Sequence, residues 1–408
     1  MAPSTSPSVP ESSPSSPLRR LSTPLLALLA LALPVTGGVL TYYELFVDGI
    51  NADGLGGAGA ATVSPDGLHV YATGAADNGI AVFRRDASAN TLAFIRAIRD
   101  GQNGVFGLQG ASAIAASSDG RAVAATGRFD DTVLLFRRDV TNNNLILTDV
   151  DQHGVGGVFG MGAPTAVVFG SDQQRVYVAA YDSDAVAVFR RDVSQDALTF
   201  VEAQVGVEGL AGPASLAVSG EYLFVAARDS HMVVMFRRNA PSDHLIWVHS
   251  FALPVGCEPT SIVNVPAGHP QLPANQLWVA CPGTGTLQAL SWQPSGLSGG
   301  ASIAIAAAQP GGNWGLRQTS GPLFLAGPDG QRLLVFSRSG NNFAKVEDLD
   351  AAAIPALAGA RAVAAMPNGQ SVWVVSFDSS ALLSFENPEF SDGFESGSTA
   401  TWSATFGN

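Results

Sequence analysis

An arginine, a glutamate and an aromatic side chain that meet around a funnel can bind a small polar or anionic molecule, and this sequence contains such a set. Trp314 and Arg361 occupy corresponding places in an internal repeat, and Glu258, His153 and Arg317 lie near such places along the chain. We name these five as candidate ligand-binding residues. Since no two of them show a spacing that a mechanism requires, ordinary loop and packing roles remain the alternative, and no catalytic residue is named.

The sequence contains no pattern typical of a metal or cofactor site. Its six histidines lack the spacing of a zinc site. It has no haem motif Cys-x-x-Cys-His, and no Gly-x-Ser-x-Gly nucleophile motif in a strand-turn-helix context. Aspartates recur in predicted tight turns, where a ring of carboxylates could attract Ca²⁺. Because such aspartates commonly bond to their own turn backbone, we favour that role and expect neither metal nor cofactor. These aspartates are Asp77, Asp130, Asp131, Asp182, Asp184, Asp229, Asp329 and Asp378.

Two cysteines are few enough to be considered singly. Cys257 falls where the first strand of one repeat is expected to begin, and Cys281 falls where its second strand is expected to end. These two ends are neighbours in an antiparallel pair, so a disulfide is geometrically possible. Two free, half-buried thiols are the alternative.

The elements that must position these residues are short strands in a repeat of about 50 residues. Phe83, Phe136, Phe189 and Phe236 each end a strand, are 53, 53 and 47 residues apart, and are followed by Arg-Arg. Each repeat also contains an apolar first strand, a turn such as Ser-Pro-Asp-Gly, a second strand and a fourth strand. The unit is therefore a four-stranded antiparallel meander, which must be repeated around an axis to bury both of its faces.

Seven third strands can be counted, and the last repeat lacks its fourth strand. Residues 40–49 match the fourth-strand pattern and precede the first complete repeat. An N-terminal strand that completes the last repeat would pair both free edges. The sequence thus predicts an all-β fold, a seven-bladed β-propeller of four-stranded antiparallel blades closed by an N-terminal strand. The third strands end near Phe83, Phe136, Phe189, Phe236, Leu290, Phe336 and Phe385.

The combination of Ser-Pro-Asp-Gly-x-x-Val-Tyr-Ala with Asp-x-Ala-Val-Ala-Val-Phe-Arg-Arg-Asp resembles the lactonase or 6-phosphogluconolactonase-like superfamily of seven-bladed propellers, including those with YVTN-type repeats. The resemblance covers residues 40–386. It implies a propeller fold and, for some members, hydrolysis of sugar lactones in the central funnel. The Pro-His pair that enzymes of this superfamily carry ahead of a Ser-Pro-Asp turn is absent here, so no catalytic residue is transferred.

Alignment of the predicted first strands indicates which residues approach the axis. Five of the seven are small or proline, as expected where seven backbones converge, and the other two are Trp314 and Arg361. The full set is Gly59, Ser112, Pro164, Ala214, Pro259, Trp314 and Arg361.

The Arg-Arg pairs are expected on the opposite face, where they could form a basic patch for an acidic glycan or lipid. The adjacent Asp86, Asp139 and Asp192 favour local ion pairs on a solvated surface instead.

Charge excludes one class of partner. The formal net charge is -13, which argues against nucleic acid or an anionic membrane surface as the main partner. We expect an unknown small polar ligand or a protein as the partner, and a monomer.

The two ends of the chain differ from its body. Residues 1–38 combine a Ser/Pro-rich start, Arg19-Arg20 and a leucine-rich apolar stretch, as expected of a secretory signal peptide, with a retained anchor as the alternative. After cleavage no integral membrane segment is expected. We assign residues 39–387 to the propeller and residues 388–408 to a C-terminal tail, and we expect a secreted or periplasmic bacterial protein.

Two classes of function follow. The first is an exported propeller that acts as a ligand- or protein-binding scaffold through its loop-rich face. The alternative is a lactonase-type hydrolase that uses the central funnel, so whether the protein is an enzyme stays open.

Overall fold

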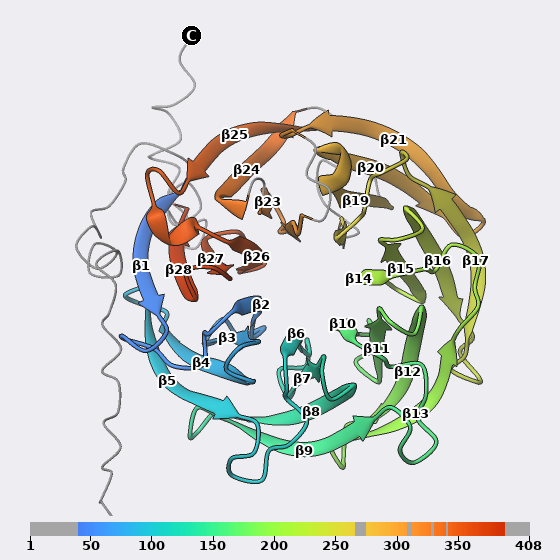
Figure 1. Ribbon diagram of the computed structural model, residues 1–408, viewed down its shortest axis with the longest axis horizontal. Coiled ribbons are helices and arrows are strands. Elements are labelled where there is room, and N and C mark those ends of the chain that lie inside the picture. Colours follow the sequence, from blue (N-terminus) through green and yellow to red (C-terminus); the bar gives the residue numbers. More distant parts are fainter. Residues whose placement is uncertain (1–39, 266–274, 308–311, 328–329, 340–341, 388–408) are drawn as a thin grey trace, which may run out of the picture. The chain divides into compact units, whose positions relative to one another are not determined.

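The computed structural model describes residues 40–265, 275–307, 312–327, 330–339 and 342–387. They form seven four-stranded antiparallel sheets that follow one another around a central axis (Figure 1). The predicted seven-bladed propeller is confirmed. The predicted signal peptide and C-terminal tail lie outside the described residues.

The first four blades contain complete sets of consecutive strands. Blade 1 consists of β2 (Ala58–Val63), β3 (His69–Gly74), β4 (Gly79–Asp86) and β5 (Thr91–Arg99). Blade 2 consists of β6 (Ala111–Ala116), β7 (Ala122–Gly127), β8 (Thr132–Asp139) and β9 (Asn144–Gln152). Blade 3 consists of β10 (Pro164–Phe169), β11 (Arg175–Ala180), β12 (Ala185–Asp192) and β13 (Ala197–Gln204). Blade 4 consists of β14 (Pro213–Ser219), β15 (Tyr222–Ala227), β16 (Met232–Arg238) and β17 (Leu245–Ala252).

The last three blades deviate more from the repeat. Blade 5 consists of β18 (Ser261–Asn264), β19 (Gln276–Cys281), the short helix η1 (Pro282–Thr284), β20 (Thr286–Gln293) and β21 (Gly296–Ala304). Blade 6 consists of β22 (Gly315–Gln318), β23 (Leu323–Ala326), β24 (Arg332–Ser339) and β25 (Asn342–Asp350). Blade 7 follows η3 (Pro355–Leu357) and consists of β26 (Ala360–Ala365), β27 (Ser371–Ser376), β28 (Ala381–Glu386) and the N-terminal β1 (Thr41–Val47).

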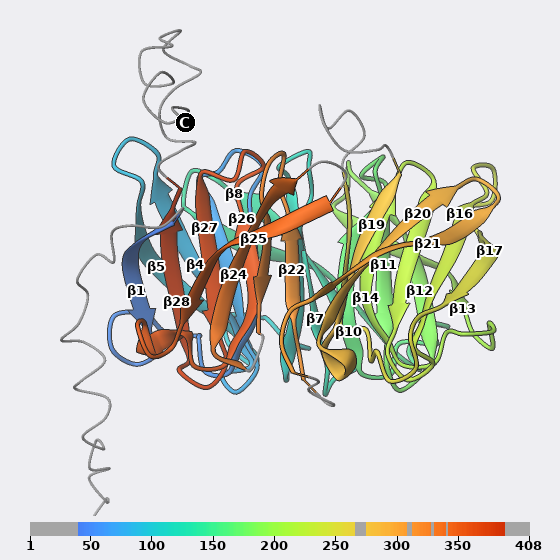
Figure 2. The same ribbon diagram turned by 90° about the horizontal axis from the view of Figure 1, so that it is seen from above.

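The N-terminal strand closes the ring as predicted. β1 pairs antiparallel with β28, from Thr41 opposite Glu386 to Val47 opposite Ala381, and completes blade 7 at its outer edge (Figures 1 and 2). The backbone N–H of Leu40 also donates to the Glu347 carboxylate of blade 6 at 2.8 Å. Closure therefore pairs an edge that an open array would expose.

The hydrophobic core lies between blades rather than within one sheet. One cluster combines Tyr71 and Ile80 of blade 1 with Ile114, Leu134 and Phe136 of blade 2. Equivalent clusters join blades 2 and 3, 3 and 4, 4 and 5, 5 and 6, and 7 and 1. Because each sheet buries both faces against its neighbours, the angle between blades depends on these contacts.

The Arg-Arg pairs correct a prediction. The first arginine of each pair is exposed. The second arginine is buried in three pairs, as Arg85, Arg138 and Arg191, and half-buried in the fourth, as Arg238. Neither member pairs with the aspartate next to it among the contacts of the described residues. Those aspartates accept hydrogen bonds from their own turns instead, as Asp86 does from the N–H groups of Ser88 and Ala89.

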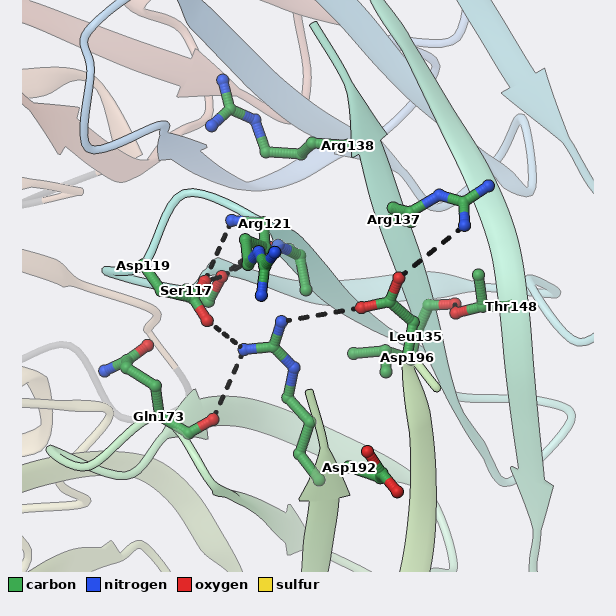
Figure 3. A network of polar contacts seen from close by, with 12 residues as sticks. Ser117, Asp119, Arg121, Leu135, Arg137, Arg138, Thr148, Gln173, Asp192 and Asp196 are labelled. Atoms are coloured by element: carbon green, nitrogen blue, oxygen red, sulfur yellow. Dashed lines mark hydrogen bonds and ion pairs between the residues drawn. The ribbon is translucent and has the colours of Figure 1, made fainter. Parts of the chain in front are cut away.

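The second arginine reaches the blade before its own. Arg138 contacts Asp66 at 2.9 Å, Arg191 contacts Asp119 at 2.8 Å, and Arg238 contacts an aspartate of blade 3 at 3.3 Å. Each acceptor lies in the turn between the first and second strands of the preceding blade. We call this contact the interblade clasp, and Figure 3 shows it at Asp119, with Gln173 and Asp196 nearby.

A second repeated contact joins the outer strands. Carboxylates of Glu44, Asp149 and Glu202 accept hydrogen bonds from the backbone N–H at the start of the next blade's outer strand, at 2.6–2.8 Å. Asp151 lies two residues beyond Asp149, and one of its oxygens is buried without a hydrogen-bond partner among the described residues. Burial, and then the charge of Asp149, raise the pKa of Asp151 to about 6.

We expect Arg138→Met to lower the free energy of unfolding by about 3 kcal/mol, because it leaves Asp66 and the Tyr71 hydroxyl without their buried donor. The matched control is Arg84→Met, which replaces an exposed arginine and should change stability by less than about 0.5 kcal/mol. Denaturant unfolding measures both. Equal losses of unfolding free energy in the two variants would contradict a stabilising role of the interblade clasp.

Asp151 should make stability depend on pH. Its folded pKa lies above its ordinary value, so the folded state loses stability as pH rises from about 4 through about 6. We expect Asp151→Asn to raise the thermal midpoint at pH 7.5 and to leave it unchanged at pH 4. Asp182→Asn, which replaces an exposed carboxylate, is the control. An equal rise in the thermal midpoint of Asp151→Asn at both pH values would show that ionisation of Asp151 is not the cause.

Candidate functional site

The first strands of the blades surround a central cavity of about 930 Å³. Its wall is formed by residues of β2, β6, β10, β14, β18, β22 and β26, together with residues that follow the second strands. As predicted, the loops that lead into the first strands and the turns between second and third strands share one face. We call this end of the cavity the mouth.

An inner ring of seven residues surrounds the mouth, and each belongs to the start of a first strand. In five blades this residue is the extra residue of a β-bulge, which has no partner on the second strand. The ring comprises Gly59, Ser112, Thr165, Ala214, Thr260, Trp314 and Arg361. The sequence alignment placed Pro164 and Pro259 here and was wrong by one residue at both places.

Hydroxyl groups of this ring connect neighbouring blades. Ser112 donates to the carbonyl of Pro164 at 2.8 Å, and Thr165 donates to the carbonyl of Pro213 at 2.8 Å. The Thr260 hydroxyl donates at 3.0 Å to the carbonyl of Trp314. The ring is therefore fixed by hydrogen bonds that leave its hydroxyls little freedom to bind a ligand.

An outer ring consists of the residues that directly follow the second strands. Arg128, Tyr181, Arg228 and Phe377 all line the cavity at this level. The Arg128 guanidinium lies 5.9 Å from the centre of the Tyr181 ring, and the Arg361 guanidinium lies 5.0 Å from that of Phe377. These four residues were not predicted from the sequence, although an alignment of second-strand ends would have found them.

The mouth carries an excess of positive charge. Burial, followed by the charges of Arg128 and Arg228, lowers the pKa of Arg361, and Asp378 opposes this effect. Arg228 pairs with Glu258 at 3.5 Å. Neither Arg128 nor Arg361 has an ion pair among the described residues. In a chain of net charge -13, two cations without carboxylate partners at the mouth of one cavity are unusual.

The five candidate residues are placed differently. Arg361 lies in the inner ring, and Trp314 lies in the wall with only 1% of its surface exposed. Arg317 lies in the wall further from the mouth, and Glu258 lies beside Arg228. His153 is exposed in the loop before blade 3, where its Nδ1 accepts from the backbone N–H of Met161 at 3.3 Å. The structure thus brings four of them to the cavity or its rim, and their role in ligand binding stays a prediction.

One acid and one phenol meet at the mouth. The Tyr181 hydroxyl donates to Asp229 at 2.7 Å. This hydrogen bond, together with burial, raises the pKa of Tyr181 above its ordinary value. At neutral pH the phenol therefore stays protonated and acts as a hydrogen-bond donor.

The prediction that the aspartates of the tight turns bond to their own turn backbone is wrong for four of them. Asp77 and Asp130 accept from backbone N–H groups of the loop before their own blade, whereas Asp131 and Asp184 accept from the backbone of the next blade. Asp329 lies outside the described residues. The carboxylates of Asp48, Asp53 and Asp77 come within 4.8 Å of one another. Arg99 pairs with Asp53 and Asp77 and neutralises much of this charge.

The disulfide prediction is confirmed. Cys257 and Cys281 are bonded, with their Cα atoms 4.5 Å apart, and both are fully buried. The backbone N–H of Gly283 donates to the Cys257 carbonyl at 3.1 Å. The loop that carries Glu258 to the mouth is thus tied to the end of β19.

Comparisons with known proteins agree with this architecture. A family model described as "Lactonase, 7-bladed beta-propeller" matches residues 62–211. No curated protein matches the sequence significantly. Among the described residues, no helix has the length and hydropathy that crossing a membrane requires.

Solved structures show the same fold at low identity. A candidate 6-phosphogluconolactonase of Bacteroides uniformis has a TM-score of 0.61 and 15% identity, with 78% of this chain and 89% of that chain covered. The periplasmic gluconolactonase PpgL of Pseudomonas aeruginosa has a TM-score of 0.59 and 17% identity, with 74% and 85% covered. Hydrazine synthase of Kuenenia stuttgartiensis has a TM-score of 0.59 and 14% identity, with 84% and 99% covered. Such different chemistry on one architecture means that function must be argued from the site.

We expect Cys257→Ala with Cys281→Ala to lower the free energy of unfolding by about 3 kcal/mol, because the bond closes a loop of sequence separation 24. Denaturant unfolding with and without a reductant measures the effect, and reduction should bring the unchanged protein to the stability of the variant. If the untreated protein reacts with two equivalents of an alkylating reagent, the disulfide is absent.

Proposed function

We propose that this chain, which is similar to lactonase-like seven-bladed β-propellers, is an exported binding protein that holds a small anionic ligand in the mouth of its central cavity. The observation that carries this proposal is the pair Arg128 and Arg361. Both guanidinium groups lie at one cavity, and neither has an ion pair among the described residues. A carboxylate or phosphate would supply the negative charge that this site lacks.

The contacts of the mouth suit a ligand with an anionic group and an uncharged body. Arginine binds a carboxylate through two parallel N–H···O hydrogen bonds, and the rings of Tyr181 and Phe377 restrict where Arg128 and Arg361 can point. Phe129, 73% exposed and also in the cavity lining, offers an apolar surface beside them. A sugar acid or a hydroxy acid combines these properties.

The proposal also includes export and a monomeric state. The signal-like N-terminus supports export, and similarity to a periplasmic gluconolactonase is compatible with it. A protein partner on the same loop-rich face is the other form that binding could take.

Hydrolysis of lactones is the second candidate function. The family model and the similarity to two lactonases by name favour it. The described part of the cavity lining contains no Asp, Glu or His side chain, so a general base would have to come from the rim. Asp229, which accepts the hydrogen bond of the cavity-lining Tyr181, is the carboxylate that we would assign as this general base.

Calorimetry with gluconate tests binding, and hydrolysis of glucono-1,5-lactone and a panel of aliphatic lactones tests turnover. We expect gluconate to bind, and Arg361→Gln to weaken binding at least about tenfold, because it removes one charge-assisted pair. Arg84→Gln replaces an exposed arginine of the far face and should leave affinity unchanged.

The outcomes separate the two candidates. Lactone turnover above background that collapses in Asp229→Asn would replace binding by catalysis as the function. Absence of binding by every monocarboxylate tried, or equal binding by Arg361→Gln, would contradict an anion site at the mouth.

A further inference from the structure

A fourth arginine, Arg317, enters the cavity wall at a place where the other blades have small or apolar residues. Arg317 is the third residue after the inner-ring residue of blade 6. The corresponding residues of the other blades are Thr62, Ala115, Val168, Ala217, Val263 and Ala364. A guanidinium in a position built for a small side chain needs an explanation, because burial of a charge without a partner is costly.

The hydrogen bonds of Arg317 leave this charge uncompensated. Its Nη2 donates to the carbonyl of Ala365 in the neighbouring blade at 3.4 Å, and its Nε is buried without a partner. Throughout the described parts of the chain, no carboxylate pairs with it. Burial alone lowers the pKa of Arg317 from its ordinary value. The Nε of Arg317 is thus a buried donor that lacks an acceptor among the described residues.

Arg317 and Arg361 line the same wall of the cavity at different depths. Arg361 is the second residue of β26 and its guanidinium lies over Phe377 at the mouth, whereas Arg317 contacts the carbonyl of the last residue of β26. Four residues of an extended strand span about 13 Å, so Arg317 meets β26 about 13 Å further along the wall than the backbone of Arg361.

We propose that the cavity binds an elongated ligand with an anionic group at each end, one held by Arg361 at the mouth and the other by Arg317 deeper in the wall between blades 6 and 7. This inference rests on the proposed function and specifies its ligand. We take this backbone spacing of about 13 Å as the spacing of the two guanidinium groups. Each guanidinium–carboxylate contact places its two carbon centres about 4 Å apart, which leaves about 5 Å between the two carboxylate carbons. A linear dicarboxylate of about five or six carbons fits that interval.

Calorimetry with a series of linear dicarboxylates from malonate to octanedioate, each matched with the monocarboxylate of the same length, tests the proposal. We expect affinity to peak at glutarate or adipate and to exceed that of the matched monocarboxylate about tenfold. Arg317→Gln should abolish this advantage and leave monocarboxylate binding unchanged, whereas Arg361→Gln should weaken both. Arg317→Met, of similar length and without charge, should behave like Arg317→Gln and controls for packing.

The outcomes are distinct from those of the proposed function. If monocarboxylates bind in a manner that depends on Arg361 but dicarboxylates gain nothing from length or from Arg317, the two-ended ligand is wrong and the mouth site stands. If neither class of acid binds the unchanged protein, both proposals fail.

Discussion

The arginine that reaches from one blade into the turn of the blade before it is the polar contact that recurs between blades 1 and 2, 2 and 3, and 3 and 4. A propeller blade buries both faces against neighbours, and apolar packing alone fixes their angle only loosely. Arg138 and Arg191 add hydrogen bonds of fixed direction to Asp66 and Asp119 across that interface. Blade 5 replaces the arginine by Trp292, whose ring packs on Tyr222 and Phe224 of blade 4.

This constraint determines the character of the cavity. When the blades are held at equal angles, seven first strands converge on one axis, and most of the innermost positions tolerate only small residues. The positions that break this rule lie in blades 6 and 7, at Trp314, Arg317 and Arg361. Trp314 packs in the hydrophobic core between blades 5 and 6, whereas Arg317 and Arg361 have no carboxylate partner among the described residues, so the presence of these two arginines is best explained by what enters the cavity.

Repetition made most of the fold predictable. Spacing of the Phe-Arg-Arg motifs, strand-length apolar segments and an unmatched fourth strand were enough to predict seven blades and their closure by β1. The predicted inner ring was displaced by one residue at Pro164 and Pro259. At Pro164 the reason is a β-bulge, which inserts a residue that alternation alone does not reveal. The partner of Arg138 was also missed, since Asp66 lies in another blade and Asp139 lies next to it. Long-range contacts of this kind follow from the angle between blades, which no local pattern contains.

Crystals of the protein soaked in selenate would test the anion site most directly, through the anomalous signal of selenium. We expect a peak between Arg361 and Arg128 at the mouth of the cavity, in contact with at least one of the two guanidinium groups. Peaks only at exposed arginines of the far face, such as Arg84 and Arg237, with an empty mouth, would contradict it.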